Sequence, residues 1–190
     1  MIEWSLDALR ASESVTAIVV AVPPAYDRAL PDDLTIVTGG ATRSRSVANA
    51  LVAVETELVA IHDAARPLLS ADLVEELVAV LAADPAAAAV IPAAAVTDTV
   101  KLAAGNEVER TLDRSSLWAA QTPQVFRTEA LRAALAVDEA ARDAATDEAM
   151  LIEAAGGRVL IHPAPAENLK VTTPHDLRVA ELLLSERLSP

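Results

Sequence analysis

The 190-residue sequence predicts an α/β fold in which a mostly parallel β-sheet is flanked by helices and carries a projecting β-arm. Segments with the period of strands alternate with segments of helical period, which implies βαβ units. The strand segment 16–22 (TAIVVAV) is apolar on both faces, as in a parallel sheet covered by helices on each side. The composition, 53% hydrophobic, shows no shift along the chain, so residues 1–190 are expected to form one domain.

The first half of the chain is expected to supply most of the sheet. After 16–22, further strands are predicted at 34–37 (LTIV), 57–61 (ELVAI) and 86–93 (AAAAVIPA). A Gly39-Gly40 turn follows the second strand. Predicted helices run from about Arg45, with Val47, Ala50, Leu51 and Val54 on one face, and over 71–83, ending at Asp84-Pro85.

The alternation changes between residues 97 and 116. The segments TDTVKL (97–102) and VERTLDR (108–114) favour extended structure and flank the turn-rich residues 103–106. This pattern predicts a hairpin or arm over about 97–116. Such an arm is often an oligomer contact, and a simple surface excursion explains the pattern equally well.

The last third returns to α/β patterning. QTPQVF (121–126) precedes a helix from Thr128 to about Val137, and a second helix is predicted to begin at Thr146, where TDEA fits an N-cap followed by acidic residues. Gly156-Gly157 ends that helix before a strand at 158–162 (RVLIH). A final helix starts at Pro174, and its expected apolar side contains Leu177, Ala180, Leu183 and Leu184.

The first residues present a mismatch. Ile2, Leu6 and Leu9 lie on one helical face, but nothing precedes Ile2 that could cap this helix. The strand 16–22 also has no earlier strand with which to pair. We therefore expect that a first strand and its loop are missing from this chain.

Charge and composition exclude several classes of protein. The formal net charge of -13 makes nucleic acids poor partners, because binding them requires a basic face. No apolar run approaches the roughly 20 residues needed to cross a membrane, and the first ten residues lack the pattern of a signal peptide. A cytoplasmic location is therefore expected. The absence of cysteine excludes disulfides and thiolate sites.

Polar residues collect where the predicted strands end. Four loops, TGGATRSRS, HDAARP, DTVK and NLKVTTP, follow four of the strands, and ligands of open parallel sheets bind outside the carboxyl ends of the strands. Each loop alone has an ordinary structural explanation, such as a tight turn or a surface ion pair, but their shared edge favours a ligand site.

The residue types in these loops suit a phosphorylated substrate. Arginine binds phosphate through two donors, and lysine neutralises developing charge. The three histidines, His62, His162 and His175, have neither zinc spacing nor the arrangement of a catalytic triad. This leaves phosphoryl or nucleotidyl transfer, in which positioning and charge stabilisation carry most of the catalysis.

The motifs GGATRSRSV, HDAARP, DTVK, LDRSSLWAAQTPQVF, TDEA and NLKVTTPHDL occur in this order along essentially the whole chain. In order and spacing the sequence resembles the 2-C-methyl-D-erythritol 4-phosphate cytidylyltransferase family, CTP-dependent enzymes of the non-mevalonate isoprenoid pathway. The resemblance implies a Rossmann-like, nucleotidyltransferase-like fold. It also implies transfer of CMP from CTP to methylerythritol phosphate, which gives 4-diphosphocytidyl-2-C-methyl-D-erythritol and pyrophosphate.

The resemblance also implies a role for each matching residue. Gly40 and Ser46 would line the cytosine pocket, Asp63 and Ala64 would contact the CTP ribose region, and Arg66 and Thr122 would bind near the methylerythritol phosphate. Thr99 and Arg114 would reach across a homodimer to hold that phosphate in the partner's site, and Lys170 would contact both this phosphate and those of CTP. Arg114 and Lys170 would thus be the catalytic residues. Mg²⁺ would shield the triphosphate, with Asp63 a candidate ligand.

The sequence departs from the family pattern in two places. Ala41 stands where many relatives carry an acidic residue, so one cytosine contact is lost or replaced by backbone. The family also opens with a strand and a glycine-rich loop that bears an arginine, followed by a Pro-Lys-Gln segment, whereas MIEWSLDAL matches the helix after them. Because losing one charge-stabilising donor commonly costs about 10²- to 10³-fold in rate, we expect little activity from this chain.

Two alternatives stay open at this stage. The chain is a non-catalytic paralogue that keeps the arm and acts as a dimer or regulatory partner, or it is a sugar-nucleotide transferase of the same fold. Under the second alternative, the agreement of the DR, LW and TPQ motifs with the cytidylyltransferase family would be a coincidence.

Overall fold

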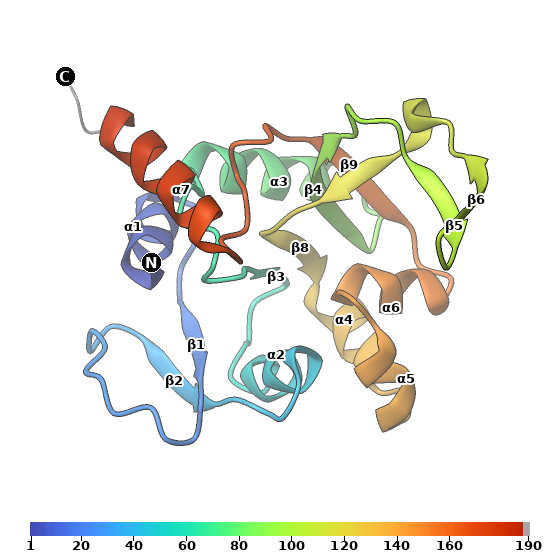
Figure 1. Ribbon diagram of the computed structural model, residues 1–190. Coiled ribbons are helices and arrows are strands. Elements are labelled where there is room, and N and C mark those ends of the chain that lie inside the picture. The colour runs from blue at the N-terminus through green and yellow to red at the C-terminus, as the bar shows by residue number, and fades with distance from the viewer. Residues whose placement is uncertain (188–190) are drawn as a thin grey trace.

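The computed structural model describes residues 1–187 and places helices on both faces of a divided β-sheet (Figure 1). The helices are α1 (Ile2–Ala11), α2 (Arg43–Leu51), α3 (Ala71–Ala83), α4 (Thr128–Leu135), α5 (Glu139–Ala144), α6 (Glu148–Ala154) and α7 (Pro174–Arg187), with a 3₁₀ turn at Arg114–Ser116. The strands are β1 (Val19–Val22), β2 (Thr35–Thr38), β3 (Leu58–Ile61), β4 (Ala89–Ala95), β5 (Lys101–Ala104), β6 (Glu107–Thr111), β7 (Trp118–Ala120), β8 (Gln124–Arg127) and β9 (Val159–Pro163). The predicted α/β class is confirmed.

The larger sheet has the order β3-β8-β4-β7, with β9 also paired to β4. Strand β8 is antiparallel to both β3 and β4, whereas β9 is parallel to β4. Strands β3, β4 and β9 therefore share one direction, as the βαβ pattern predicts, and β7 and β8 run against them. The segment QTPQVF supplies β8, for which the sequence pattern had predicted no strand.

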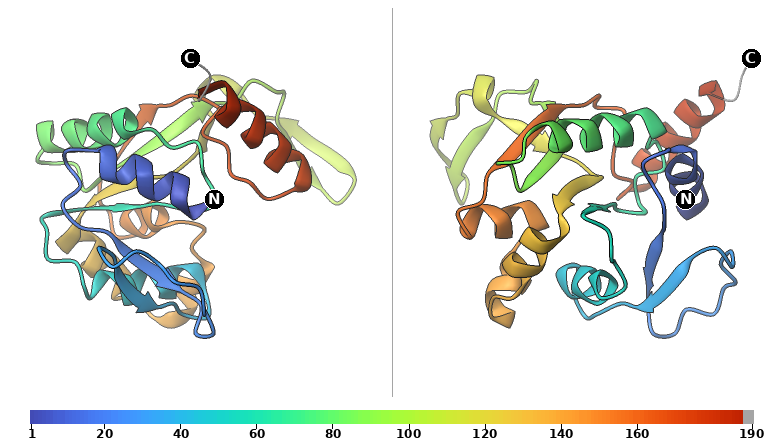
Figure 2. Two further views of the ribbon diagram at one scale, coloured as in Figure 1. Left: turned by 90° about the vertical axis from the view of Figure 1, so that its left-hand side faces the viewer. Right: turned by 180° about the vertical axis from the view of Figure 1, so that it is seen from behind.

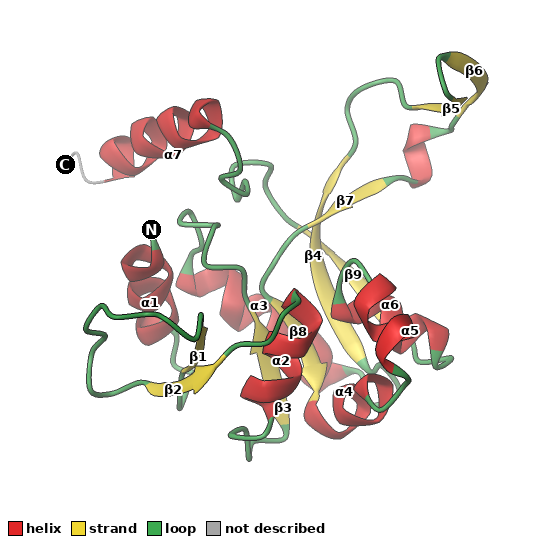
Figure 3. Cartoon of the chain, turned by 60° about the horizontal axis from the view of Figure 1, so that its bottom comes forward, coloured by secondary structure: helices red, strands yellow, loops and turns green. Residues whose placement is uncertain are grey.

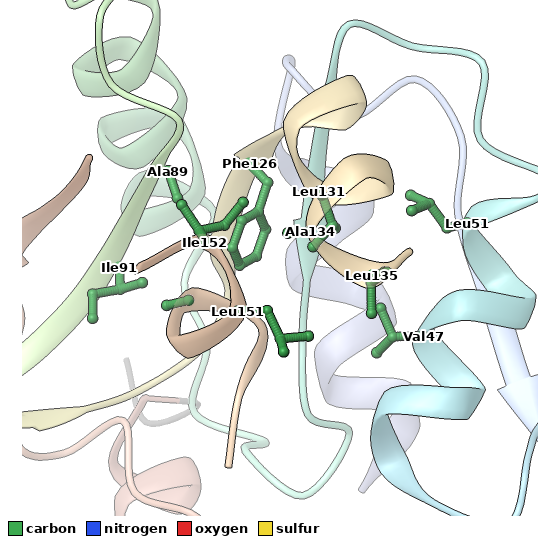
Figure 4. Close-up of a cluster of buried hydrophobic side chains, with 11 residues drawn as sticks. Val47, Leu51, Ala89, Ile91, Phe126, Leu131, Ala134, Leu135, Leu151 and Ile152 are labelled. Carbon is green, nitrogen blue, oxygen red and sulfur yellow. The ribbon is translucent and has the colours of Figure 1, made fainter. Parts of the chain in front are cut away.

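Two hydrophobic cores lie on opposite faces of this sheet. Successive side chains of a strand point to opposite faces, so Ala89 and Phe126 join one cluster while their neighbours Val90 and Val125 join the other. The first cluster packs beneath α2, α4 and α6 (Figure 4). The second packs beneath α3, and Figure 2 shows α3 and α2 on opposite sides of the sheet.

The remaining two core strands form a sheet of their own. Strand β1 pairs in parallel with β2, and within residues 1–187 no pairing joins β1 to β3. A cavity of about 580 Å³ lies between β1 and β3 and is lined by residues of both strands. Among the described residues, β1 therefore pairs on one side only. The N-cap of α1 is Met1, which makes no side-chain capping bond, as predicted.

The predicted arm is a hairpin of β5 and β6 that stands away from the sheet (Figure 3). Gly105 takes a positive φ of 57° at its turn, a conformation that glycine adopts without the steric cost that a Cβ would impose. Every residue of both strands is exposed. The arm therefore contributes little to the folding core of a single chain.

Several predicted helix details differ from the structure. Helix α2 begins at Arg43, because Thr42 caps it by accepting a hydrogen bond from the backbone N–H of Arg45. Helix α6 begins at Glu148 rather than Thr146, because the capping side chain is Asp147. Helix α5 precedes it and was not predicted. No helix within residues 1–187 is long and apolar enough to span a membrane.

The last helix buries less of its predicted apolar side than expected. Ala180 is buried, and Leu183 and Leu184 are half-buried. Leu177, however, is 40% exposed. The apolar contact of α7 therefore lies toward its carboxyl-terminal half.

Candidate functional site

The loop after β2 is held in a tight form by its glycines. Ser46 Oγ accepts a hydrogen bond from the backbone N–H of Gly40 (3.0 Å) and donates one to the carbonyl of Thr42 (3.0 Å). A Cβ added at Gly40 would overlap the Cβ of Arg45. Two of the predicted site residues, Gly40 and Ser46, are thus in direct contact, and only glycine fits at position 40.

Asp63 lies at the centre of the site, just after β3. Its Oδ1 accepts a hydrogen bond from Arg43 Nε (2.9 Å), and its Oδ2 is 2.9 Å from Lys170 Nζ. Burial alone would raise the pKa of the Asp63 carboxyl, but Lys170 and Arg43 outweigh it and hold that pKa below its ordinary value. Three of the four predicted loops therefore meet at one carboxylate, as their shared edge of the sheet had predicted.

Glu148 extends this cluster into the protein interior. Its side chain has no exposed surface, and Oε2 accepts a hydrogen bond from Arg43 Nη1 (2.6 Å). Burial raises the pKa of this carboxyl, and the neighbouring Arg43 guanidinium opposes that change. Oε1 is buried without a hydrogen-bond partner among the described residues. Arg43 is thus fixed between a buried carboxylate and the carboxylate at the site.

Thr122 supports Asp63 from the neighbouring strand end. Its Oγ1 accepts a hydrogen bond from the backbone N–H of Asp63 (3.0 Å) and is 3.1 Å from His62 Nδ1. His62 Nε2 is in turn 3.3 Å from Ser5 Oγ on α1. Burial lowers the pKa of His62 to about 4. His62 is therefore a neutral structural histidine at ordinary pH, in keeping with the sequence pattern.

Arg66 spans the space between two loops. Its Nη1 donates to the carbonyl of Asn168 (2.7 Å) and its Nη2 to that of Ala120 (3.4 Å), while Nε is buried without a partner in the described part of the chain. Asn168 is itself buried and donates to the carbonyl of Thr122 (2.9 Å). Arg66 consequently lies beside Thr122 and the loop that carries Lys170.

Three predicted site residues do not join this cluster. Ala64 is exposed directly after Asp63. Thr99 and Arg114 are exposed at the base of the arm, where Arg114 donates to the carbonyl of Thr97. Lys101, in the fourth predicted loop, bonds to Thr111 within the hairpin. Of the four loops, DTVK therefore leads into the arm and away from Asp63.

The cluster offers little to a metal ion held by protein alone. Within the described part of the chain, no group of three or more histidine, aspartate or glutamate side chains could hold one. Both carboxylate oxygens of Asp63 are bonded to cations, and its role as a Mg²⁺ ligand stays a prediction.

Sequence reasoning did not select Arg43 and Glu148 as site residues. They lie 105 positions apart in the chain, so no local spacing indicates their contact. The only available signals were that each lies in a motif of the resemblance, Arg43 in GGATRSRSV and Glu148 in TDEA.

Comparison with known proteins bears on the identity of this fold and site. A sequence profile of the IspD family, 2-C-methyl-D-erythritol 4-phosphate cytidylyltransferase, matches residues 1–186. A cytidylyltransferase of this name from Bordetella petrii is 43% identical over 95% of this chain and 84% of its own length. A bifunctional enzyme IspD/IspF from Anaeromyxobacter dehalogenans is 44% identical, and this chain spans about half of it (49%).

A solved structure shows the same fold. The crystal structure of 2-C-methyl-D-erythritol 4-phosphate cytidylyltransferase from Thermus thermophilus is 34% identical and superposes with a TM-score of 0.86, covering 97% of this chain and 88% of that one. The match of the family profile to residues 1–186 disfavours the sugar-nucleotide transferase alternative. The chain belongs to the 2-C-methyl-D-erythritol 4-phosphate cytidylyltransferase family, nucleotidyltransferases of isoprenoid biosynthesis.

Proposed function

We propose that this chain binds CTP and 2-C-methyl-D-erythritol 4-phosphate at the carboxyl edge of its sheet and contributes to transfer of CMP between them. The observation that carries the proposal is the convergence of Arg43, Asp63 and Lys170 from three separate segments of the chain. Around them, Gly40 and Ser46 form the proposed cytosine side of the site.

The proposed chemistry is an in-line displacement at the α-phosphorus of CTP. A phosphate oxygen of methylerythritol phosphate forms the new P–O bond while the bond to pyrophosphate breaks, so the leaving pyrophosphate carries the displaced electron pair. Lys170 suits a role at these phosphates, because its side chain is 42% exposed and its ammonium is oriented by Asp63. An ammonium placed in advance lowers the barrier by stabilising the charge that develops on the phosphate oxygens.

Arg66 and Thr122 are proposed to face the methylerythritol phosphate. Their support is their position beside the Asp63 cluster and the buried Asn168 that joins them. Ala64 is proposed to contact the ribose of CTP through its backbone, next to Asp63.

The arm is proposed to form a homodimer and to deliver Thr99 and Arg114 to the phosphate site of the partner subunit. Both residues are exposed at the base of the arm, and Arg114 bonds there to Thr97 rather than to the Asp63 cluster of its own chain. The hairpin also exposes Leu102 and Val108, which are 39% and 60% exposed, and Trp118, which follows the arm in β7, is 38% exposed. Exposed apolar side chains on a projecting element are a feature of protein contacts.

Mg²⁺ is proposed to arrive with the triphosphate rather than in a site made by protein alone. Magnesium commonly binds through substrate phosphates together with one or two carboxylates, and Asp63 is already bonded to two cations. A cytoplasmic location is likewise proposed, as expected from the sequence.

A pyrophosphate-release assay with CTP and methylerythritol phosphate tests the proposed function. It is run on this chain and on a version extended with the in-frame coding sequence upstream of Met1. The resemblance predicts weak activity in the first, and higher activity in the second if the added sequence encodes the family's strand and glycine-rich loop. Activity in neither would favour the non-catalytic paralogue, and equal activity in both would contradict the expected loss.

A further inference from the structure

The loop that carries Lys170 inserts a polar side chain into the protein interior. This loop covers residues 164–173, between the end of β9 and the start of α7, and the structure describes all of it. Asn168 is 3% exposed, whereas every other residue of the loop is exposed or half-buried. The buried anchor of the loop is therefore an amide and not an apolar side chain.

Gln121 sets the orientation of that amide. Its Nε2 donates a hydrogen bond to the carbonyl of Pro165 (2.9 Å), so its Oε1 is the atom that faces Asn168. Asn168 Nδ2 donates to this Oε1 (3.1 Å) and to the carbonyl of Thr122 (2.9 Å). Asn168 Oδ1 is buried without a partner among the described residues, which is costly. What the amide contributes is thus its two N–H donors, which meet two buried acceptors.

These bonds close a circuit that begins and ends at Asp63. Thr122 Oγ1 accepts a hydrogen bond from the backbone N–H of Asp63 (3.0 Å), and the carbonyl of Thr122 accepts from Asn168 (2.9 Å). Two residues after Asn168, the ammonium of Lys170 is 2.9 Å from Asp63 Oδ2. Thr122 therefore holds both members of this ion pair, one directly and the other through Asn168.

The backbone of the loop is bonded on both sides of Lys170. The carbonyl of Asn168 accepts a hydrogen bond from Arg66 Nη1 (2.7 Å). The N–H of Val171 donates to the carbonyl of Ala65 (2.8 Å). Because a lysine ammonium stands on a flexible stem, its reach toward a substrate phosphate depends on where this backbone is held.

We propose that Asn168 is a positioning residue for Lys170, which it places by holding the loop against Thr122. This inference rests on the proposed function of Lys170 at the substrate phosphates, and Asn168 acts only through that residue. A misplacement of about 1 Å in a catalytic group can cost about 10²-fold in rate. Loss of the amide donors should therefore lower kcat and change KM less.

Amide hydrogen exchange at Val171 tests the holding role without any substrate. It is followed by NMR on this chain and on Asn168→Ala. The Val171 amide should exchange about tenfold faster in the variant, because two hydrogen bonds that hold the loop are lost, whereas the amides of β4 should change less. Glu167→Ala, at an exposed position of the same loop, is the control. Unaltered exchange at Val171 in Asn168→Ala would overturn the inference.

The kinetic test is a double-mutant cycle on whichever version of the chain is active in the pyrophosphate-release assay. Asn168→Asp keeps the shape of the side chain but, when ionised, has no donor, and Asn168→Ala removes the amide without adding a charge. Each should lower kcat by about 10- to 10²-fold. In a chain that already carries Lys170→Ala, the same substitutions should lower kcat by less than about threefold, because the group that Asn168 places is absent.

The outcomes separate this inference from the proposed function. If the Asn168 substitutions lower kcat as much in the Lys170→Ala background as alone, or have no effect, Asn168 does not act through Lys170. A purely structural role predicts the equal losses, so all rates are measured below the melting temperature of each variant. An unchanged rate in Lys170→Ala alone would instead contradict the proposed function on which the inference rests.

Discussion

At the scale of single residues, the carboxyl groups of Asp63 and Glu148 lie in different environments, and their pKa values shift in opposite directions. Asp63 is bonded to two cations, whereas Glu148 is fully buried and has Arg43 as its charged partner. Removing one partner of a buried ion pair leaves the other uncompensated, which commonly costs about 3–5 kcal/mol. Arg43 serves both carboxylates, so changes at Glu148 are expected to reach the site.

We expect Glu148→Ala to lower the free energy of unfolding by about 3 kcal/mol, because it leaves the Arg43 charge without its buried partner. The loss is expected at the low end of the range because Arg43 keeps Asp63 as a partner. Denaturation by urea measures this change. The matched control is Glu153→Ala, at an exposed position of the same helix, which should change stability by less than about 0.5 kcal/mol. Equal effects of the two substitutions would contradict the role assigned to Glu148.

His62 makes a second prediction, on the pH dependence of stability. Its pKa in the folded chain is about 4, below the ordinary value of 6.5, so the unfolded state binds more protons between these values. Stability should therefore fall as pH drops from about 6.5 to 4, by up to about 3 kcal/mol from this residue.

Chemical denaturation at a series of pH values, on the unchanged chain and on His62→Gln, measures this effect. The substitution should flatten the profile between pH values of about 6.5 and 4. His175→Gln, an exposed histidine of α7, serves as the control and should leave the profile as it was. A profile that His62→Gln does not alter would show that burial of this imidazole is not linked to folding.

The sequence allowed part of the site to be predicted, and the reason lies in distance along the chain. The loops that carry Asp63, Arg66 and Lys170 were found because each follows a predicted strand, and strand ends meet at one edge, while the family resemblance selected the residues within them. Arg43 lies in one of these loops but was not selected, and its contact with Glu148 joins residues 105 positions apart. Local patterns predict where a strand ends but not which side chain from a distant helix will reach it.

At the scale of elements, the hairpin and β8 show what periodicity can and cannot predict. The hairpin was predicted because its turn and alternation are local features. The segment 121–126 gave no such signal, since β8 is short and its burial depends on two strands from elsewhere in the chain. Likewise, the start of α6 shifted to Glu148 because two candidate caps, Thr146 and Asp147, are adjacent in sequence.

The arm yields a third prediction. If the hairpin forms the homodimer contact, Val108→Lys should convert the dimer into a monomer in sedimentation velocity, because it places a charge in an apolar contact. Val52→Lys is the control, since Val52 is 84% exposed at the end of α2, outside the arm. A dimer that survives Val108→Lys, or a chain that is monomeric without any substitution, would rule out this contact.

At the scale of the whole molecule, the chain combines a family fold with a divided sheet. Helices cover two cores on opposite faces, and the structure superposes on a solved cytidylyltransferase with a TM-score of 0.86. The α/β class followed from periodicity. The size of the cavity between β1 and β3 did not, because it depends on how two sheets sit relative to one another.

The central claim is that the cluster at Asp63 and Lys170 is the phosphate-handling site of a cytidylyltransferase. The most direct test is the rate of 4-diphosphocytidyl-2-C-methyl-D-erythritol formation, followed by phosphorus NMR. The rate is measured for Lys170→Ala in whichever version of the chain is active in the pyrophosphate-release assay. Arg158→Ala is the control. Arg158 directly precedes β9 and pairs with Asp84, away from the carboxyl edge of the sheet. The account predicts a loss of about 10²- to 10³-fold for Lys170→Ala and little change for the control. Product formation at an unchanged rate in Lys170→Ala would contradict it.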